Sequence, residues 1–351
     1  MGLMIYGANG YTAKIMIDDA AHFGLKPILG GRSATIKVLA EEKGLEYRIF
    51  DLQNAPETEK ALQGIIVVLH CAGPFRFTAL QMMEACLKTG THYLDITGEI
   101  NVFELGASLN QKAIERGIMM MPGVGFDVVP TDCLAAFLKN QLPEASSLKL
   151  AFAGLGGSMS KGTTMTMVEG MGEGSKVRKN GKIESVPLGF KTMELTYNGK
   201  NLFFMTIPWG DVSTAFYTTG IPNIETYTTV SKKRYSKLGW MNAFGWLLKL
   251  DFIKEFARKK VRQGPAGPTD EVRKNSRTYI WGEVTDKEGN KLRAYYTTPN
   301  GYTVTSHTGL LIAKKVLEGS FKIGFHTPAG LYGQDLIQEI QDITPFSIIP
   351  N

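Results

Sequence analysis

The sequence contains few cysteines and no long uninterrupted apolar run. No uncharged hydrophobic stretch reaches the roughly 20 residues that span a bilayer, so we expect no transmembrane helix. The three cysteines among 351 residues, Cys71, Cys86 and Cys133, each lie in an apolar segment and do not form the spaced set of a disulfide framework. We therefore expect a reducing compartment and a cytoplasmic protein, with association at a membrane surface left open.

Signals for export, metal binding and nucleic-acid binding are also missing. The first apolar run reaches a glycine-rich turn at Gly7, so we expect no signal peptide. The five histidines show no metal-ligand spacing, and we expect no metal site. The net charge is +6, but the basic residues are dispersed except at 232–234 and 258–262, without a basic stripe interleaved with aromatics. We expect no nucleic-acid partner.

Short apolar runs alternate with helical patterns in the first third of the chain. Gly24 and Gly44 stand where helix ends take a positive φ, and Ser33 is a suitable N-cap. This alternation predicts an α/β fold with a doubly wound parallel sheet, that is, a Rossmann domain. The predicted strands are 3–6, 27–29, 47–50, 65–69, 92–94 and 118–121, and the predicted helices are 11–23, 33–43, 82–88 and 102–115.

The pattern changes near residue 148, where shorter apolar runs alternate with polar residues. Such alternation predicts a second domain with a mixed or antiparallel sheet that has one wetter face. The predicted strands here are 148–152, 193–197, 202–207, 214–218, 279–284 and 292–297. Residues 154–174 are rich in Gly, Ser, Thr and Met, and we expect them to form a flexible loop or to line a ligand.

A glycine-rich turn joins the first predicted strand to the first helix. Gly7 and Gly10 allow a tight turn and a close approach of the backbone to a pyrophosphate, which the helix N-terminus then stabilises. The strand–turn–helix context is what a dinucleotide-binding motif requires, although a purely structural turn stays an alternative. The predicted contacts from this turn are Gly7, Asn9, Gly10, Tyr11 and Thr12.

No acidic residue follows the second predicted strand, where NAD-binding proteins usually carry Asp or Glu for the ribose hydroxyl. Arg32 stands there instead, about 25 residues after Gly7. Arg32 would pair with a 2′-phosphate, assisted by the hydroxyl of Ser33, so the sequence predicts NADP as the cofactor. A solvated arginine is the alternative. Further predicted cofactor contacts are Asp51 and Leu52 at the adenine edge, and Cys71, Ala72, Gly73, Pro74 and Phe75 beneath the nicotinamide ribose.

Hydride transfer also requires a proton source near the nicotinamide. Asp95, Glu99 and Asp127 follow predicted strand ends, where functional groups gather in an open parallel sheet. We take these three carboxylates as the catalytic candidates. The alternatives are that Asp127 caps the next helix and that Asp95 and Glu99 order their loops. For His70 and Cys71 the sequence favours a packing role over a chemical one, because neither has an evident partner.

Residues 238–262 are aromatic, amphipathic and followed by a basic run. This composition occurs in helices that lie at a membrane interface, but it also suits other roles. Three interpretations stay open: a core helix, a contact with a lipid surface or a lipid-like substrate, and a dimer face. Methionines at 165, 167 and 171 are compatible with an adaptable apolar cavity or with ordinary core packing.

Several stretches resemble the saccharopine dehydrogenase-like oxidoreductases, and more closely the branch that contains the trans-acting enoyl reductases. The resemblance implies NADP, a Rossmann domain at 1–125, a second domain for substrate or oligomerisation at 126–310, and a C-terminal segment, 311–351, that returns to the first domain. The stretches that carry it are 7–12, 71–75, 93–99, 122–132, 264–265, 301–305 and 327–329.

These observations predict an NADPH-dependent oxidoreductase that transfers hydride to a C=C or C=N bond of a bulky small-molecule substrate, such as one with an acyl chain. One alternative is an opine- or saccharopine-type amino-acid dehydrogenase, which would need arginines for two or more carboxylates. Arg178, Arg273 and Arg277 are the candidates for that role in the second domain. The other alternative is a non-catalytic NADP-binding protein at a lipid surface. A homodimer also stays open.

Overall fold

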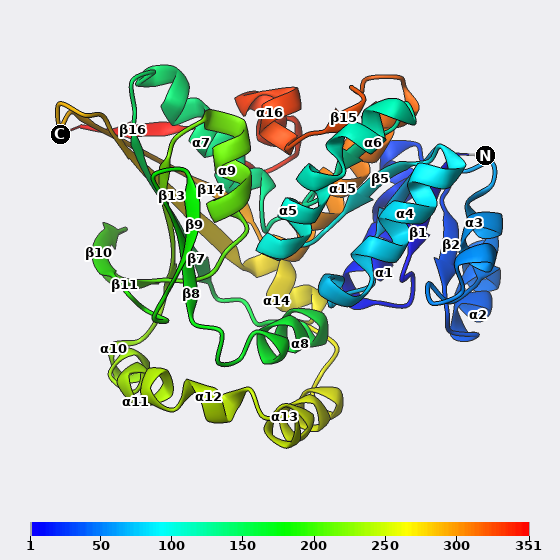
Figure 1. Ribbon diagram of the computed structural model, residues 1–351, viewed down its shortest axis with the longest axis horizontal. Helices are drawn as coiled ribbons and strands as arrows, with labels where there is room; N and C mark the ends of the chain where they lie inside the picture. The colour runs from blue at the N-terminus through cyan, green and yellow to red at the C-terminus, as the bar shows by residue number, and fades with distance from the viewer. Residues whose placement is uncertain (1, 351) are drawn as a thin grey trace. The chain divides into compact units, whose positions relative to one another are not determined.

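The computed structural model describes residues 2–350, apart from the side chains at 240 and 241. The chain forms two compact units, and each contains two separate stretches of sequence (Figure 1). Unit 1 comprises the residues up to Val129 together with Tyr302–Gly333, and unit 2 comprises Pro130–Gly301 together with the residues from Gln334 onward. The longer stretch of unit 2 is therefore inserted into unit 1, and its shorter stretch follows unit 1.

Unit 1 contains the alternating strands and helices that the sequence predicts. Its strands are β1 (Leu3–Tyr6), β2 (Ile28–Gly31), β3 (Tyr47–Ile49), β4 (Val67–His70), β5 (His92–Asp95), β6 (Met119–Met121) and β15 (Gly324–Phe325). Its helices are α1 (Tyr11–Asp19), η1 (Ala20–Phe23), α2 (Thr35–Lys43), α3 (Ala55–Leu62), η2 (Phe75–Phe77), α4 (Ala79–Thr89), α5 (Ile100–Ser108), α6 (Asn110–Glu115), α15 (Gly301–Leu317) and α16 (Pro328–Tyr332).

The strands of unit 1 form one seven-stranded sheet in the order β15-β6-β5-β4-β1-β2-β3, and every pairing is parallel. The predicted doubly wound parallel sheet is thus confirmed. Gly24 and Gly44 end their helices in the left-handed conformation, as predicted. The predicted single helix 102–115 is two helices, because the chain leaves helical geometry at Leu109.

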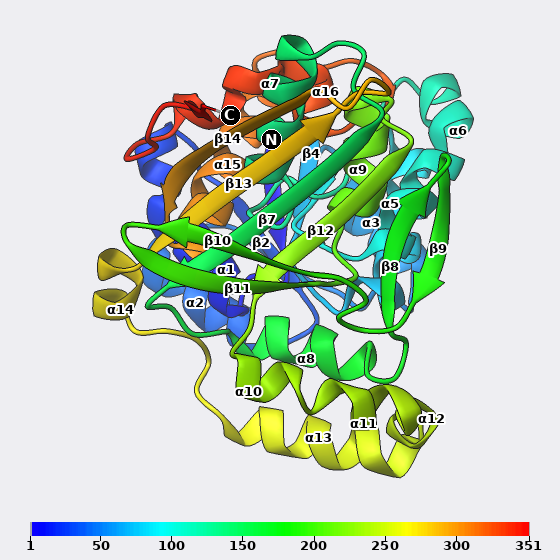
Figure 2. The ribbon, with the colours of Figure 1, turned by 90° about the vertical axis from the view of Figure 1, so that its left-hand side faces the viewer.

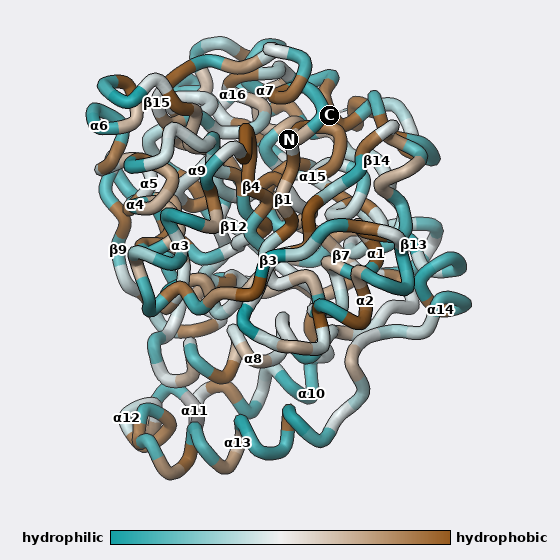
Figure 3. The backbone as a smooth tube through the Cα atoms, turned by 90° about the vertical axis from the view of Figure 1, so that its right-hand side faces the viewer, coloured by the Kyte–Doolittle hydropathy of each residue, from teal (hydrophilic) through white to brown (hydrophobic). Residues whose placement is uncertain are grey.

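Both faces of this sheet are buried, as its apolar strands require. Met4 and Val68 belong to the core that the helices α3, α4 and α5 cover. On the other face α15 lies beside α1, because Gly309 of α15 approaches both Met16 and Leu69. In Figure 3 the central strands β1 and β4 are among the most hydrophobic parts of the trace.

Unit 2 is built on a mixed sheet. Its strands are β7 (Ser147–Leu155), β8 (Ser175–Lys179), β9 (Lys182–Val186), β10 (Thr192–Tyr197), β11 (Lys200–Thr206), β12 (Asn223–Thr229), β13 (Arg277–Thr285), β14 (Lys291–Pro299) and β16 (Ser347–Ile349). Its helices are α7 (Val129–Gln141, from Pro130 onward), α8 (Lys161–Glu169), α9 (Asp211–Thr219), α10 (Lys232–Tyr235), α11 (Leu238–Ala243), α12 (Gly245–Leu248), α13 (Asp251–Gln263), α14 (Asp270–Asn275) and η3 (Gln334–Glu339).

The main path of the mixed sheet runs β10-β11-β12-β7-β13-β14-β16, with β8 and β9 attached beside β12 (Figure 2). Only the pairing of β12 with β7 is parallel. Helix α7 packs against this sheet, since a side chain at Gly282 of β13 would meet Leu134 and Leu138. The predicted mixed second sheet is confirmed.

The predicted strand at 214–218 is wrong, because these residues belong to helix α9. The helix ends at Gly220 in the left-handed conformation. Its first residue, Asp211, is fully buried and accepts a hydrogen bond from Thr131 of α7 at 2.6 Å. These tertiary contacts outweigh the preference of threonine for strands. The sequence reading also missed β12, which pairs with both β7 and β11, and it missed α8 within 154–174.

The unit boundaries differ from the predicted limits of 125 and 310. The chain crosses into unit 2 at Pro130 and returns at Tyr302, so that most of α15 lies in unit 1. The segment predicted to return to the first domain, 311–351, is divided. Its last part belongs to unit 2, because β16 extends the mixed sheet by pairing with β14.

The close packing of α15 against α1 and the sheet predicts that only a small side chain fits at Gly309. A Cβ there would lie 2.9 Å from the terminal methyl of Met16, which can swing aside, so Gly309→Ala should change stability little. Gly309→Val should lower the stability by about 1–3 kcal/mol, because the branched side chain overpacks the same space. Thermal unfolding of both variants, followed by circular dichroism, measures the difference. Equal midpoints for the two variants would show that α15 does not pack closely here.

Candidate dinucleotide-binding site

The predicted cofactor residues gather at one edge of the unit 1 sheet. Tyr6 at the end of β1 pairs with Gly30 of β2 on one side and with His70 of β4 on the other. The loops that begin at residues 7, 32, 50, 71 and 96 therefore all follow the carboxyl ends of neighbouring parallel strands. From β1 the chain adds β2 and β3 on one side, then crosses to β4 on the other side of β1, and ligands bind at such a reversal of strand order.

The glycine-rich turn has the geometry that a pyrophosphate requires. Gly7 has a φ of 84°, and a Cβ on it would lie 2.8 Å from the backbone nitrogen of Ala72. Gly10 is the N-cap of α1 and offers no side chain to the first helical amides, and the first turn contains no acidic residue. These amides and the positive end of the helix dipole suit an anion. The residues present therefore fit a dinucleotide phosphate.

Arg32 follows β2 and Asp51 follows β3, and both charges act on the hydroxyl of Tyr6. Burial and the charge of Asp51 raise the pKa of Tyr6 to about 12, although a backbone hydrogen bond and the charge of Arg32 oppose this rise. Arg32 itself is exposed. The Ser33 hydroxyl is 2.8 Å from that of Thr35. Helix α2 begins at Thr35, so its N-cap is residue 34 and the predicted N-cap at Ser33 is wrong. This edge thus presents an exposed cation and two neighbouring hydroxyls.

Not every predicted contact presents its side chain to a ligand. Leu52 and Phe75 are buried in the core of unit 1, so only their backbone remains for a cofactor. Cys71 packs against Met16, with 3.7 Å between the two sulfur atoms, and burial raises its pKa. The thiol is therefore protonated at physiological pH and serves as a packing group.

His70 orders the loop that follows β4. Its Nε2 lies 3.0 Å from the hydroxyl of Thr78, which donates to the carbonyl of Ala72 at 2.8 Å. The single hydroxyl proton of Thr78 points to the Ala72 carbonyl, so Nε2 of His70 must donate to Thr78. In this tautomer Nδ1 carries no proton. Burial lowers the pKa of His70 to about 3, so the ring is neutral and cannot serve as an imidazolium acid. The sequence reading missed Thr78.

Glu99 braces the same loop from the side of β5. Its two carboxylate oxygens accept hydrogen bonds from the backbone amides of Phe75 at 2.7 Å and Arg76 at 3.1 Å. The Arg76 guanidinium adds an ion pair at 3.5 Å. The peptide bond between Gly73 and Pro74 in this loop is cis. This geometry favours the loop-ordering alternative for Glu99.

Asp95 joins the loops after β5 and β6. The fully buried carboxylate accepts hydrogen bonds from the Tyr93 hydroxyl at 2.6 Å and from the amides of Thr97 at 2.9 Å and Gly123 at 2.8 Å. Its own carbonyl accepts from the amide of Val124. Burial raises the pKa of Asp95 to about 6 although these bonds lower it. Both carboxylate oxygens are thus engaged by the fold, which favours the loop-ordering alternative here as well.

Asp127 differs from the other two carboxylates, because no residue in the described chain hydrogen-bonds its side chain. The carboxyl lies against Gly98, where a Cβ would be 2.7 Å from Oδ2, so that glycine makes room for it. Burial without compensation raises the pKa of Asp127 to about 7. The capping alternative finds no support in these contacts. Asp127 is the carboxyl at this edge best suited to exchange a proton near neutral pH.

Helix α15 positions the loop that carries Asp127. Thr305 accepts a hydrogen bond from the amide of Phe126 at 3.0 Å, and Thr308 donates to the carbonyl of Val124 at 2.7 Å. Tyr302 meets Tyr11 edge to face, with 5.1 Å between the ring centroids. The sequence reading noted 301–305 as a resemblance only. The functional reason for this stretch is its contact with the cofactor turn and the Asp127 loop.

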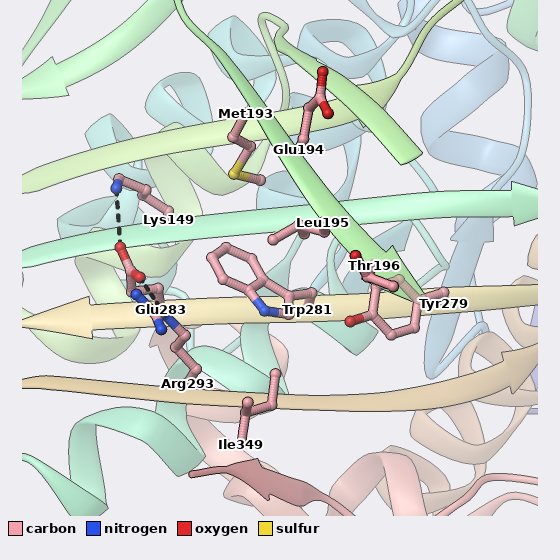
Figure 4. Close-up of a pocket in the computed structure, with 10 residues that line it drawn as sticks. All are labelled: Lys149, Met193, Glu194, Leu195, Thr196, Tyr279, Trp281, Glu283, Arg293 and Ile349. Atoms are coloured by element: carbon pink, nitrogen blue, oxygen red, sulfur yellow. Dashed lines mark hydrogen bonds and ion pairs between the residues drawn. The ribbon is translucent and has the colours of Figure 1, made fainter. Parts of the chain in front are cut away.

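A separate concavity of about 440 Å³ lies on the sheet of unit 2 (Figure 4). Its aromatic floor includes Trp281, and its charged end is Glu283, which is held by Lys149 at 2.9 Å and Arg293 at 2.6 Å. Burial opposes the ionisation of Glu283, but these two cations outweigh it and lower its pKa. Glu283 is thus held by two cations and is not available as an acid or base.

The strand order, the glycine turn and the exposed cation after β2 define a dinucleotide-binding domain. Residues 3–121 match the sequence model of the family described as "Saccharopine dehydrogenase NADP binding domain". The predicted resemblance to this family and the predicted cofactor, NADP, are therefore confirmed for this domain.

Relatives and solved structures agree with this assignment. A saccharopine dehydrogenase-like oxidoreductase of Bos taurus is 27% identical over 217 residues, which are 53% of this chain and 50% of the relative. A trans-acting enoyl reductase of Mycobacterium tuberculosis (strain ATCC 25177 / H37Ra) is 28% identical over 139 residues, which are 37% of this chain and 33% of that protein. The matched sequence thus spans half or less of these curated relatives.

The fold extends the similarity over both units. The solved structure of apo saccharopine dehydrogenase (L-Glu forming) from Saccharomyces cerevisiae superposes with a TM-score of 0.67, at 14% identity, and covers 99% of this chain and 100% of that one. At this level of identity the likeness concerns the fold alone.

The exposed Arg32 predicts the choice between NADPH and NADH. Arg32→Asp should weaken NADPH binding at least about 30-fold, because a charge-assisted contact worth about 1.5–3 kcal/mol is replaced by repulsion of the 2′-phosphate. NADH binding should change less than about 3-fold, because NADH lacks that phosphate. Titration of each nucleotide by fluorescence measures both constants.

Arg116→Asp is the matched control, because Arg116 is also exposed but precedes β6, at the opposite edge of the sheet. This variant carries the same change of charge and should bind NADPH as the parent does. Equal losses in the two variants would mean that Arg32 acts only through the overall charge.

Proposed function

We propose that this protein is an NADPH-dependent oxidoreductase that reduces a C=C or C=N bond of a bulky substrate with an acyl-chain character. The observation that carries the proposal is the pairing, at one sheet edge, of a dinucleotide turn with the uncompensated carboxyl of Asp127. The names of the curated relatives, an oxidoreductase and an enoyl reductase, support the same class of reaction.

The residues of unit 1 divide the work of cofactor binding. The turn at Gly7 and Gly10 would hold the pyrophosphate, and Arg32 with Ser33 would hold the 2′-phosphate. Glu99 and Thr78 fix the loop 71–75, which keeps its backbone in one conformation beside the turn. Bound NADPH supplies a hydride to the substrate carbon.

Asp127 supplies the proton that completes the reduction. Reduction adds a hydride to one atom of the double bond and a proton to the other, so that the acid ends as a carboxylate and regains a proton from solvent. A group with a pKa near 7 is present in its acidic form in about half of the molecules at neutral pH, which suits a general acid. The Asp127 side chain is half-buried and keeps some exposed surface through which it can be reprotonated.

The arginines of unit 2 give little support to the amino-acid dehydrogenase alternative. Arg178 is buried, donates to the carbonyls of Val212 and Gly181, and stacks on a phenylalanine ring. Arg273 pairs with Asp270, and Arg277 donates to the carbonyl of Asp342. Each guanidinium is thus engaged within its own unit. Exposed apolar side chains at Met159 and Met167 favour an apolar substrate instead.

A substrate screen tests the proposed reaction. We expect the protein to oxidise NADPH with enoyl thioesters, and to prefer longer acyl chains, while pairs of keto acids and amines give no turnover. Turnover with the keto-acid and amine pairs alone would favour the amino-acid dehydrogenase. Binding of NADPH without oxidation in either series, at any acyl length, would favour the non-catalytic alternative.

The role of Asp127 makes a separate prediction. Asp127→Asn should lower kcat by about 10²- to 10⁴-fold, the usual contribution of a general acid, while NADPH binding changes little. In the parent, kcat should fall as the pH rises through about 7, because the acidic form is required. Glu84→Gln, which changes an exposed carboxylate of α4, is the control and should keep both kcat and its pH profile.

The raised pKa of Asp127 also affects the stability of the folded protein, and this effect can be measured without a substrate. Between about pH 4, where an unfolded aspartate titrates, and pH 7 the folded protein keeps a proton that the unfolded chain releases. The parent should therefore lose stability relative to Asp127→Asn as the pH rises through this window, and the two should be nearly equal below it. A constant difference in the thermal midpoint across the window would show that the pKa of Asp127 is not raised.

A further inference from the structure

The segment 232–263 of unit 2 is held in place by specific contacts. The Asn242 side chain exchanges two hydrogen bonds with the backbone of Leu188, at 3.1 and 3.0 Å, and Tyr235 donates to the carbonyl of Gly189 at 3.2 Å. A Cβ on Gly172 would lie 2.4 Å from the carbonyl of Gly245, so α12 approaches the loop after α8 closely. The segment is therefore a docked part of unit 2, with α8 between α13 and the mixed sheet (Figures 1 and 2).

Helix α13 is docked through its charged face. Arg258 makes a double hydrogen bond to the carboxylate of Glu169, at 2.7 and 2.9 Å, and Lys254 donates to the carbonyl of the same residue at 2.7 Å. Glu169 is only 5% exposed, so its charge depends on this partner. Rotating α13 would leave that buried carboxylate uncompensated, which is strongly unfavourable.

The opposite face of α13 carries two phenylalanines that the described part of the chain leaves largely uncovered. Phe252 is 71% exposed and Phe256 is 74% exposed, and their spacing of four places them on one side of the helix. Around the helix axis, Lys254 lies about 200° from Phe252, and Arg258 lies about 200° from Phe256. A surface helix normally turns its large apolar side chains inward, whereas α13 leaves these two phenylalanines in solvent. Phe244 and Trp246, at the start of α12, are also exposed, so the core-helix interpretation of 238–262 is wrong for these residues.

The charge of this segment indicates what covers the phenylalanines. Residues 232–263 contain ten Lys and Arg against two acidic residues, whereas the remaining sequence has 29 basic and 31 acidic residues. The entire positive excess of the chain therefore lies here. Lys259 and Lys260 are exposed and stand three and four residues after Phe256, beside the apolar face. Aromatic side chains flanked by lysines match the boundary of an anionic lipid layer.

We propose that segment 232–263 is a membrane-docking surface that binds the face of an anionic phospholipid bilayer. Phe252 and Phe256 enter the boundary between head groups and acyl chains, and the flanking lysines contact the lipid phosphates and carboxylates. Docking is peripheral, since no helix in the described part of the chain has both the length and the apolarity to cross a bilayer. This inference does not depend on the proposed reaction.

Flotation of the full chain with lipid vesicles tests the surface. At low salt we expect binding to vesicles of phosphatidylserine and phosphatidylcholine, weak binding to phosphatidylcholine alone, and loss of binding at high salt. Phe252→Ser with Phe256→Ser should weaken the partition about 10- to 100-fold. Lys259→Glu with Lys260→Glu should weaken it at least about 10-fold while keeping both phenylalanines.

Two matched controls come from the same unit. Phe190→Ser with Ile348→Ser removes two exposed apolar side chains elsewhere, and Lys179→Glu with Lys182→Glu makes the same charge change in the β8–β9 hairpin. Both should float as the parent does, and every variant should still bind NADPH, which verifies folding. Because Trp246 is 63% exposed, brominated lipid should also quench its emission, and Trp246→Phe should reduce that signal.

Three outcomes would overturn the proposal. The parent could fail to float with anionic vesicles at low salt, or the phenylalanine variant could float as well as the parent. Light scattering without lipid could also show a dimer that the phenylalanine variant alone loses. That last result would assign the face to a second copy of this chain.

Discussion

The cofactor edge depends on one buried charge, the carboxylate of Asp95. Its three hydrogen bonds join the end of β5 to the loop after β6, and no water is needed to satisfy it. A carboxylate without these partners would not stay ionised at zero exposure. The loop that leads to Asp127 begins at Gly123, one of the groups that Asp95 binds. Asp95 therefore fixes the start of the loop that carries Asp127.

A second set of contacts fixes the remaining loops from elements that are distant in sequence. Glu99 holds the amides of Phe75 and Arg76, and Thr305 and Thr308 hold the backbone between Val124 and Phe126. None of these three side chains needs to touch a ligand. They position backbone and acid groups on rigid elements, which is what precise binding and proton transfer require.

Local patterns predicted the parallel sheet, the glycine turn and the residues at the strand ends, because periodicity and turn chemistry are short-range properties. The patterns could not predict contacts between distant residues. Thr78 acquires its role from His70, Glu169 from Arg258, 89 positions away, and Thr305 from Phe126. Helix α9 escaped prediction for the same reason, because its buried Asp211 accepts a hydrogen bond from Thr131 of another helix. The spacing of Phe252 and Phe256 was visible in the sequence, but the side of α13 that faces solvent was not.

The insertion of unit 2 into unit 1 imposes an order on synthesis. When the ribosome has completed β6, the strands that carry Gly7, Arg32 and Asp95 already exist, yet Thr305 and Thr308 do not. The inserted stretch Pro130–Gly301 must be made first, which takes roughly 10–30 s at ordinary translation rates. Until then the loop before Asp127 lacks its support, and the face of the sheet that α15 covers stays open. The nascent chain therefore reaches a binding-competent state late, and a chaperone would meet an incomplete nucleotide domain throughout that interval.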